Sequence, residues 1–217
     1  MIVFTGMVVS KNFYKNIPVS LLAVTALLLA FGGWEAGKYQ IVPKRFGIVE
    51  QDRVFRSGRI APHLIRKTLQ KHGIKVIVDL TEPDQRNASW RAEQKAAEEL
   101  GISRYNFQLC GDGTGNITNY ANAIFAIEQA RKENKPVLVH CAAGTQRTGG
   151  VIAAYRLLVE KHTPATAYAE LTRYGWKSRH DRILLDYLNN HMNELAALLR
   201  EMKVIAKAPK PAPQIAP

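Results

Sequence analysis

Residues 136–150 read PVLVHCAAGTQRTGG, and this stretch decides the fold. Its first five residues are almost entirely apolar and rich in valine, which predicts a strand buried on both faces. Residues 141–148 are small or polar with a glycine at their centre, so they predict a tight loop. Residues 149–160 then have the composition of a helix. Strand, loop and helix in this order are typical of an α/β fold.

The sequence on either side of this stretch alternates between strand and helix signals. We expect strands at residues 53–57, 75–80, 104–109 and 136–140, and helices at 61–72, 87–100, 120–134, 149–160, 164–174 and 181–202. Strands separated by helices form mainly parallel sheets with helices on both faces. The predicted fold class is therefore α/β, with the functional site at the carboxyl ends of the strands.

The composition is that of an ordinary globular protein with an excess of positive charge. The chain has 217 residues, 47% of them hydrophobic and 22% charged, and only two cysteines, which excludes a disulfide scaffold. Its net charge of +12 indicates an anionic partner, such as a phosphorylated substrate, a lipid headgroup or a nucleic acid. No stretch interleaves basic and aromatic residues densely, so we do not expect nucleic-acid binding.

Four segments are predicted along the chain. Residues 1–34 form an N-terminal anchor, residues 35–50 a linker, residues 51–202 the catalytic domain and residues 203–217 a disordered tail. Residues 17–34 carry no charged side chain, and about 18 residues of helix are just enough to cross a bilayer. We expect this apolar helix to be a single-pass membrane anchor. A cleaved secretory signal is the alternative, and the sequence does not decide on which side of the membrane the domain lies.

The loop after residues 136–140 has the composition of an anion-binding site. Five residues separate Cys141 from Arg147, with Gly144 between them, so the backbone N–H groups can curl around one centre at a helix N-terminus. This positive environment favours the thiolate of Cys141, and the planar guanidinium of Arg147 can hold two phosphate oxygens. We therefore expect Cys141 to be a nucleophile at neutral pH.

The succession of His140, Cys141, five residues, Arg147 and Thr148 resembles the signature of the cysteine-dependent protein tyrosine phosphatase superfamily, in its dual-specificity-like (atypical) branch. The resemblance implies a phosphate-binding loop made of His140, Cys141, Ala142, Ala143, Gly144, Thr145, Gln146, Arg147 and Thr148. It implies phosphoryl transfer to Cys141, stabilisation by Arg147, help from Thr148 in the departure of the sulfur, and a structural role for His140. It also implies that no metal or cofactor takes part.

The same resemblance implies a general acid on another loop. Asp112 lies between two glycines after the strand at residues 104–109, at the separation from Cys141 that is usual in the family. Asp79 and Asp84 are the alternatives. Cys110, two residues before Asp112, is a candidate redox partner for Cys141, although a buried structural thiol is the simpler interpretation. A segment at residues 56–58 (RSG) resembles one that packs near the site in the atypical branch.

The expected function is hydrolysis of phosphomonoesters, on phosphotyrosine or dual-specificity protein substrates or on small phosphomonoesters. The five neutral residues inside the loop favour a singly phosphorylated group, but phosphoinositides and inositol phosphates remain alternatives. A rhodanese-like sulfurtransferase would need no general acid, and a non-catalytic phosphate-binding module would not need to keep Cys141, Arg147 and Asp112. The sequence does not predict the oligomeric state.

Overall fold

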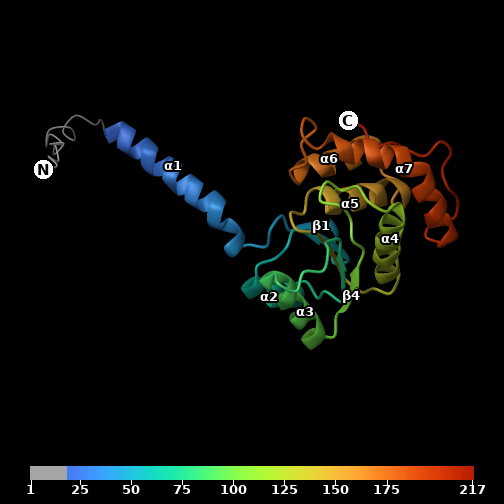
Figure 1. Cartoon of the computed structure of the whole chain (residues 1–217), viewed down its shortest axis with the longest axis horizontal. Coiled ribbons are helices and arrows are strands. Elements are labelled where there is room, and N and C mark those ends of the chain that lie inside the picture. Colours follow the sequence, from blue (N-terminus) through green and yellow to red (C-terminus); the bar gives the residue numbers. More distant parts are fainter. Residues whose placement is uncertain (1–18) are drawn as a thin grey trace, which may run out of the picture. The chain divides into compact units, whose positions relative to one another are not determined.

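Five strands form one sheet in the order β1-β2-β5-β3-β4 (Figure 1). The computed structural model describes residues 19–217. Its strands are β1 (Gly47–Glu50), β2 (Val54–Ser57), β3 (Val76–Asp79), β4 (Ser103–Asn106) and β5 (Val137–His140). Its helices are α1 (Val19–Gly37), α2 (Pro62–Lys71), α3 (Ala88–Leu100), α4 (Ile117–Lys132), α5 (Gln146–Leu158), α6 (Pro164–Arg173) and α7 (Arg182–Glu201), with a short 3-10 helix η1 (Lys38–Gln40).

The sheet is mixed, with β5 at its centre. Strand β5 pairs in parallel with β2 and β3, and β3 pairs in parallel with β4. Strand β1 pairs antiparallel with β2 at one edge. The prediction of a mainly parallel α/β sheet is confirmed, and the antiparallel edge is an addition to it. The carboxyl ends of β2, β3 and β5 lie together, because Ser57 and Asp79 both pair with His140.

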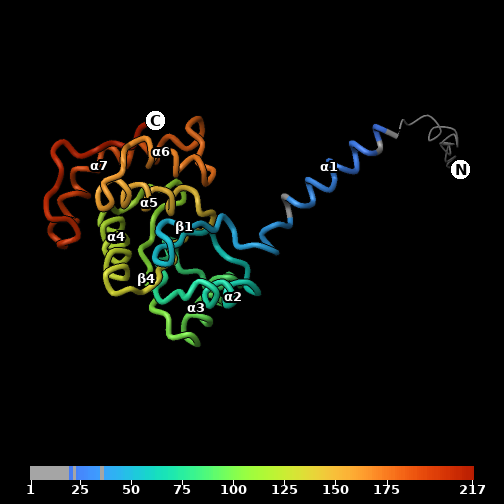
Figure 2. The backbone as a smooth tube through the Cα atoms, turned by 180° about the vertical axis from the view of Figure 1, so that it is seen from behind, coloured from blue at the N-terminus to red at the C-terminus, as the bar shows by residue number. Residues whose placement is uncertain are grey.

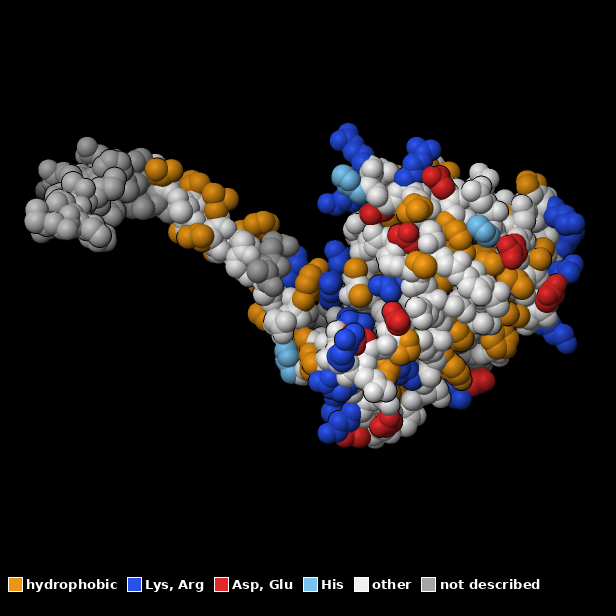
Figure 3. All heavy atoms as spheres, viewed as in Figure 1, with side chains coloured by type: hydrophobic (Ala, Val, Ile, Leu, Met, Phe, Trp, Pro, Cys, Tyr) orange, Lys and Arg blue, Asp and Glu red, His pale blue; other side chains and the backbone are white. Residues whose placement is uncertain are grey.

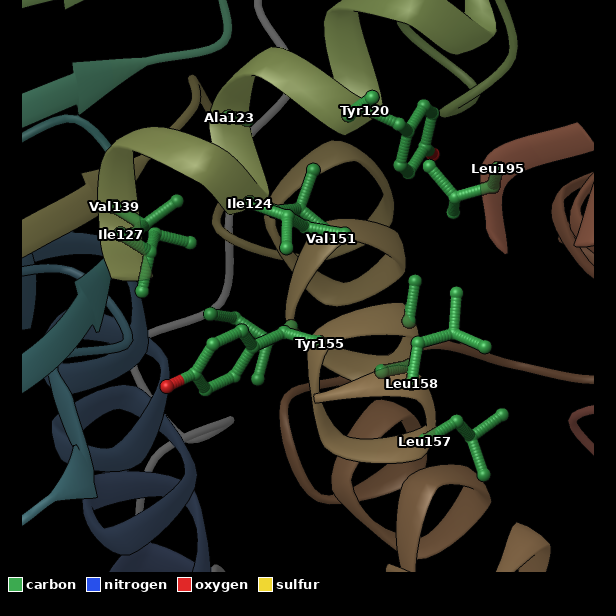
Figure 4. Close-up of a cluster of buried hydrophobic side chains, with 14 of the residues drawn as sticks. Tyr120, Ala123, Ile124, Ile127, Val139, Val151, Tyr155, Leu157, Leu158 and Leu195 are labelled. Atoms are coloured by element: carbon green, nitrogen blue, oxygen red, sulfur yellow. The ribbon is translucent and has the colours of Figure 1, made fainter. Parts of the chain in front are cut away.

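Helices cover both faces of this sheet (Figures 1 and 2). Helices α4, α5, α6 and α7 lie on one face, where their apolar side chains pack with β3 and β5 in the larger core. Part of this core is shown in Figure 4, in which Ile127 of α4 lies beside Val139 of β5. Helices α2 and α3 cover the other face through a smaller core. Helix α5, which carries the sequence after the cysteine loop, is therefore held between the sheet and α6 and α7.

Two helices begin earlier than the sequence predicted. Helix α4 starts at Ile117 rather than at residue 120, because the Asn116 side chain caps it by accepting from the Thr118 N–H at 2.8 Å. Helix α5 starts at Gln146 rather than at residue 149. Arg147 and Thr148 consequently lie in the first turn of α5, where the unpaired N–H groups of a helix are found.

The compact unit that contains the sheet spans Tyr39–Pro217, so it begins before the predicted boundary at residue 51. Strand β1 lies within the expected linker at residues 35–50. The C-terminal residues expected to be disordered pack against α7 instead: Ile215 is buried, and its N–H and carbonyl both bond to the amide of Asn189.

The N-terminal apolar segment is described in part. Residues 17 and 18 of the expected membrane helix lie outside the described residues, and α1 follows from Val19 to Gly37. Within residues 19–217, no helix combines the length and the apolar character needed to cross a membrane. The membrane anchor stays a prediction.

Candidate active site

Cys141 lies at the end of the central strand and is almost completely buried, with 1% of its surface exposed. The loop turns back over it, and the Gly144 N–H donates to Cys141 Sγ at 3.1 Å. Gly144 has a φ of +77°, and a Cβ at this position would lie 2.6 Å from the Gly58 backbone nitrogen. Only glycine therefore allows the loop to close this tightly against the end of β2.

Three successive carbonyl groups of the loop accept hydrogen bonds from residues outside the loop. Each accepts one hydrogen bond from a different arginine, at 2.8–3.1 Å. The pairs are Arg59 N–H with the Ala142 carbonyl, Arg45 Nη1 with the Ala143 carbonyl and Arg56 Nη2 with the Gly144 carbonyl. Because these oxygens are engaged on the outer side of the loop, the arrangement leaves its N–H groups to bind an anion.

Arg56 of β2 supports the loop through its buried side chain. Its side chain is fully buried, pairs with Glu170 of α6 at 3.0 Å and lies 3.7 Å from the centre of the Tyr174 ring. Burial lowers the pKa of this guanidinium, while Glu170 counteracts the effect. The charge is thus compensated locally, and Arg56 acts on the loop through the Gly144 carbonyl. The sequence segment at residues 56–58 does lie at the site, as its resemblance implied.

The surroundings of Cys141 favour its thiolate. Burial alone would raise the pKa of the thiol, but Thr148, the charge of Arg147 and the Gly144 N–H together lower it below its ordinary value. The Thr148 hydroxyl is buried and has no other hydrogen-bond partner among residues 19–217. The first turn of α5 and the loop therefore stabilise a negative charge on the Cys141 sulfur.

Arg147 lines a small pocket beside the cysteine loop. The pocket has a volume of about 300 Å³ and is also lined by Arg59, Thr81, Asp84 and Ala142. No carboxylate in the described part of the chain lies within ion-pair distance of Arg147, and its buried Nε has no hydrogen-bond partner there. A planar, unpaired guanidinium beside a nucleophile is suited to bind the oxygens of a phosphate.

Asp112 lies in the loop before α4. One of its carboxylate oxygens accepts from both the N–H and the hydroxyl of Thr114, at 2.9 and 2.8 Å. These bonds, with the charge of Arg147, lower the pKa of Asp112. The adjacent Gly113 lies against Gln146 at the start of α5, since a Cβ on it would lie 3.4 Å from that residue. The structure therefore brings the predicted acid loop to the N-terminus of α5.

The two alternative acids are in different places. Asp79 is buried, and its carboxylate accepts from Thr81 and Arg104. Its carboxylate is therefore held by these hydrogen bonds inside the fold. Asp84 lines the pocket together with Arg147 and forms an ion pair with Arg86 at 3.8 Å. Asp84 stays an alternative to Asp112.

His140 belongs to a buried network behind the thiol. Its Nε2 lies 3.0 Å from Glu93 of α3, and Arg104 of β4 donates to both Glu93 and Asp79. Burial works against a charged imidazole, but Glu93 and Asp79 outweigh it and raise the pKa of His140 to about 9. Although Asp79, Glu93 and His140 could together ligate a metal ion, the Arg104 guanidinium and the protonated His140 imidazole together already balance the charges of the two carboxylates.

Cys110 is exposed, whereas Cys141 is buried, and both are free thiols in the structure. The proposed disulfide between them therefore stays a prediction.

Several residues that shape the site were missed by the sequence analysis. Arg45 and Lys44 lie in the segment taken for a linker, so no motif pointed to them. Glu93 carried a signal that could have been used. It lies on the apolar face of α3 with Trp90, Ala96 and Ala97, all of them buried. An acidic residue at such a position predicts a buried ion pair.

A comparison with protein families identifies the domain. Residues 60–201 match the family model for the dual specificity phosphatase catalytic domain. The match includes β5, the loop around Cys141 and the first turn of α5.

The chain is similar to two curated proteins over part of their length. The chain is 30% identical over 126 residues to protein tyrosine phosphatase domain-containing protein 1 of Bos taurus, covering 52% of this chain and 16% of that protein. It is 35% identical over 68 residues to dual specificity protein phosphatase OPG106 of Vaccinia virus, covering 31% of this chain and 40% of that protein. The matches thus span less than half of either relative.

The core catalytic domain of the PP-IP phosphatase SIW14 from S. cerevisiae, crystallised with citrate, has the same fold. The TM-score is 0.59 at 18% sequence identity, over 75% of this chain and 95% of that one. With the family model matching more than half of the chain, and with the cysteine loop built as described, the chain belongs to the dual specificity phosphatase catalytic domain family.

Proposed function

We propose that this domain hydrolyses phosphomonoesters through a cysteinyl-phosphate intermediate. The observation that carries the proposal is the buried thiol of Cys141, whose pKa is lowered by Thr148, Arg147 and Gly144 inside a loop whose carbonyls are bonded outward. This arrangement supplies a nucleophile and the groups that bind the phosphoryl oxygens at one place.

In the first step the thiolate of Cys141 attacks phosphorus and the bond to the ester oxygen breaks. Arg147 and the loop N–H groups stabilise the charge on the non-bridging oxygens. Asp112 gives its proton to the departing oxygen. Because hydrogen bonds from Thr114 lower the pKa of Asp112, the carboxyl carries this proton at mildly acidic pH, or when the negative charge of the bound substrate raises its pKa.

In the second step a water molecule attacks phosphorus and the S–P bond breaks. The carboxylate of Asp112 takes a proton from the water, so it regains the form that the next cycle needs. The Thr148 hydroxyl stabilises the departing thiolate, and inorganic phosphate is released. His140 transfers no proton in this scheme, because its imidazole bonds to Glu93 in the interior.

For the substrate we propose a chemical class. The residues inside the loop between Cys141 and Arg147 are neutral, which favours a singly phosphorylated group such as protein phosphotyrosine. A second candidate is a phosphoinositide or an inositol phosphate. It is favoured by Lys44 and Arg59, whose charges lie beside the loop rather than in it.

The function can be tested with the full chain and p-nitrophenyl phosphate in the absence of added metal. We expect turnover that vanadate inhibits, and a loss of at least about 1000-fold in kcat for Cys141→Ser, since the less nucleophilic hydroxyl replaces the thiolate. Cys110→Ser serves as the matched control, because Cys110 is exposed. Turnover that survives Cys141→Ser would refute the mechanism.

We also propose that residues 17–34 attach the domain to a membrane. The support is the absence of charged side chains from this segment and the exposure of Leu27, Leu29 and Phe31 in α1. Release of the expressed full chain from membranes by alkaline carbonate alone would contradict an integral anchor.

A further inference from the structure

We propose that Lys44 and Arg59 form a second anion-binding subsite beside the catalytic loop, which holds the neighbouring phosphate of a phosphorylated polyol headgroup. The inference rests on the proposed function and specifies its substrate: a ring or chain that carries two phosphates on adjacent carbons. The first phosphate would bind at Cys141 and Arg147, and the second would bind to the two cations outside the loop.

Arg59 is fixed directly against the loop. Its N–H donates to the Ala142 carbonyl at 3.1 Å, and its guanidinium lies 3.5 Å from the Thr81 hydroxyl. Thr81 is itself held by Asp79, to which its hydroxyl donates at 2.7 Å. The side chain of Arg59 therefore lines the same pocket of about 300 Å³ as Arg147.

Lys44 reaches the same region from the segment before β1. Its carbonyl accepts from the Gly58 N–H at 2.7 Å, and its side chain lies against Gly58, since a Cβ on that glycine would be 3.1 Å from Lys44 Cδ. Partial burial and the neighbouring charges of Arg45 and Arg59 lower the pKa of Lys44, while the thiolate of Cys141 raises it. Lys44 is thus within electrostatic reach of both the nucleophile and Arg59.

The charges of these side chains are not neutralised by the protein. Arginines with structural roles are paired: Arg56 with Glu170, and Arg104 with Glu93 and Asp79. In contrast, no carboxylate within residues 19–217 forms an ion pair with Lys44, Arg59 or Arg147. The acidic residues that also line the pocket are Glu82, which is exposed, and Asp84, which pairs with Arg86.

Lys44 lies with its ammonium 5.7 Å from the centre of the Tyr39 ring, and neither it nor Arg59 has a carboxylate partner among residues 19–217. Two cations of this kind next to a phosphate site indicate that the ligand brings more than one phosphate. Figure 3 shows many further Lys and Arg side chains on the left flank of the catalytic unit. Because Arg59 and Arg147 line one pocket of about 300 Å³, a second phosphate bound by Arg59 has to lie close to the first. Adjacent carbons of a polyol provide this spacing, whereas the anionic neighbours of a phosphotyrosine in a peptide lie farther from its phosphate.

The test compares two substrates on variants of the full chain. The substrates are a vicinal myo-inositol bisphosphate and p-nitrophenyl phosphate, and the readout is the ratio of their kcat/KM values. We expect Arg59→Met and Lys44→Met each to lower this ratio about tenfold, the effect of one lost charge-assisted hydrogen bond of about 1.4 kcal/mol. Lys135→Met is the matched control. It removes a positive charge beside the N-terminal end of β5, where Lys135 pairs with Glu133, and should leave the ratio unchanged.

A second arm separates the subsite from catalysis. Binding of the bisphosphate to Cys141→Ser is measured by calorimetry, and adding Arg59→Met should weaken it about tenfold. If wild type fails to hydrolyse p-nitrophenyl phosphate, the proposed function is wrong and the calorimetry alone decides the subsite. An unchanged ratio together with unchanged affinity would overturn the subsite, and so would an Arg59 dependence seen only with a diphosphorylated peptide. A further measurement replaces the soluble bisphosphate by vesicles that contain a phosphatidylinositol bisphosphate. The substrate with the larger kcat/KM shows whether the headgroup comes from a soluble molecule or from a lipid.

Discussion

At the scale of single residues, the proposed role of Asp112 as a general acid conflicts with its hydrogen bonds in the structure. A general acid must carry a proton, yet the hydrogen bonds from Thr114 favour the ionised carboxylate. Only one carboxylate oxygen takes part in these bonds, so the other can face a leaving group. The loop therefore fixes the orientation of the acid, and its protonated fraction falls as the pH rises above its lowered pKa.

This conflict predicts the behaviour of Asp112→Asn. We expect kcat to fall about 100-fold for an alkyl phosphate, whose leaving group needs a proton, and much less for p-nitrophenyl phosphate. Because protonated Asp112 is lost with rising pH in the wild type, kcat/KM should decline on the alkaline side of its optimum. That decline should be absent in Asp112→Asn. Steady-state kinetics across pH with both substrates measure the two effects.

The matched variants are Asp52→Asn and Asp84→Asn. Asp52 is exposed in the turn before β2 and forms no ion pair among residues 19–217, so its variant should behave as the wild type. Asp84 lies in the pocket with Arg147. If Asp84→Asn rather than Asp112→Asn loses activity selectively on the alkyl phosphate, Asp84 is the acid.

At the scale of elements, the network of His140, Glu93, Asp79 and Arg104 joins α3 to three strands. His140 ends β5, Asp79 ends β3, Arg104 belongs to β4 and Glu93 to α3. All four side chains are at most 15% exposed, and their formal charges balance. Buried charges of this kind are tolerated when each has its partner, and removal of one partner leaves the others uncompensated.

Glu93→Gln should therefore destabilise the fold. We expect the free energy of unfolding to fall by about 3–5 kcal/mol, as is typical when one member of a buried pair is removed. Glu98→Gln on the exposed face of the same helix is the control and should change it by less than about 0.5 kcal/mol. Urea unfolding followed by circular dichroism measures both.

The same network predicts a pH dependence. The pKa of His140 is about 9 in the folded chain and 6.5 ordinarily, so its contribution is complete below pH 6.5 and is lost as the pH rises through 9. As the pH rises from 6 to 10, the urea concentration at the midpoint of unfolding should therefore fall more steeply for the wild type than for Glu93→Gln. Equal slopes would show that His140 is not held as an imidazolium.

The elements that the sequence predicted are those with strong local signals. The apolar run at residues 136–140 and the valine-rich run at residues 75–80 gave β5 and β3, and the pattern from Cys141 to Arg147 gave the loop. Strand β1 was missed because it has only four residues and is defined by its pairing with β2. The contacts of Arg45 with the loop and of Glu93 with His140 were missed for the same reason. Contacts between distant segments leave no local pattern in the sequence.

At the scale of the whole molecule, α7 connects the C-terminal segment to the acid loop. Near its start, the Tyr187 hydroxyl donates to the Gly115 carbonyl in the loop that follows Asp112. Two residues further on, Asn189 bonds to the backbone of Ile215. Packing of residues 206–217 on α7 therefore stabilises a helix that also contacts the catalytic region.

Replacing Ile215 by alanine tests this arrangement. Ile215 is 2% exposed in the larger core, so Ile215→Ala should lower the free energy of unfolding by about 2–5 kcal/mol through the lost apolar contacts and the cavity left behind. Ile183→Ala, the same change at a side chain that is 53% exposed in α7, should cost less than about 1 kcal/mol. Because the backbone of Ile215 bonds to Asn189 of α7, turnover of p-nitrophenyl phosphate by Ile215→Ala should match the wild type well below the melting temperature of the variant, and should be lost at a lower temperature than in the wild type. Equal melting temperatures for the two variants would contradict a packed C-terminal segment.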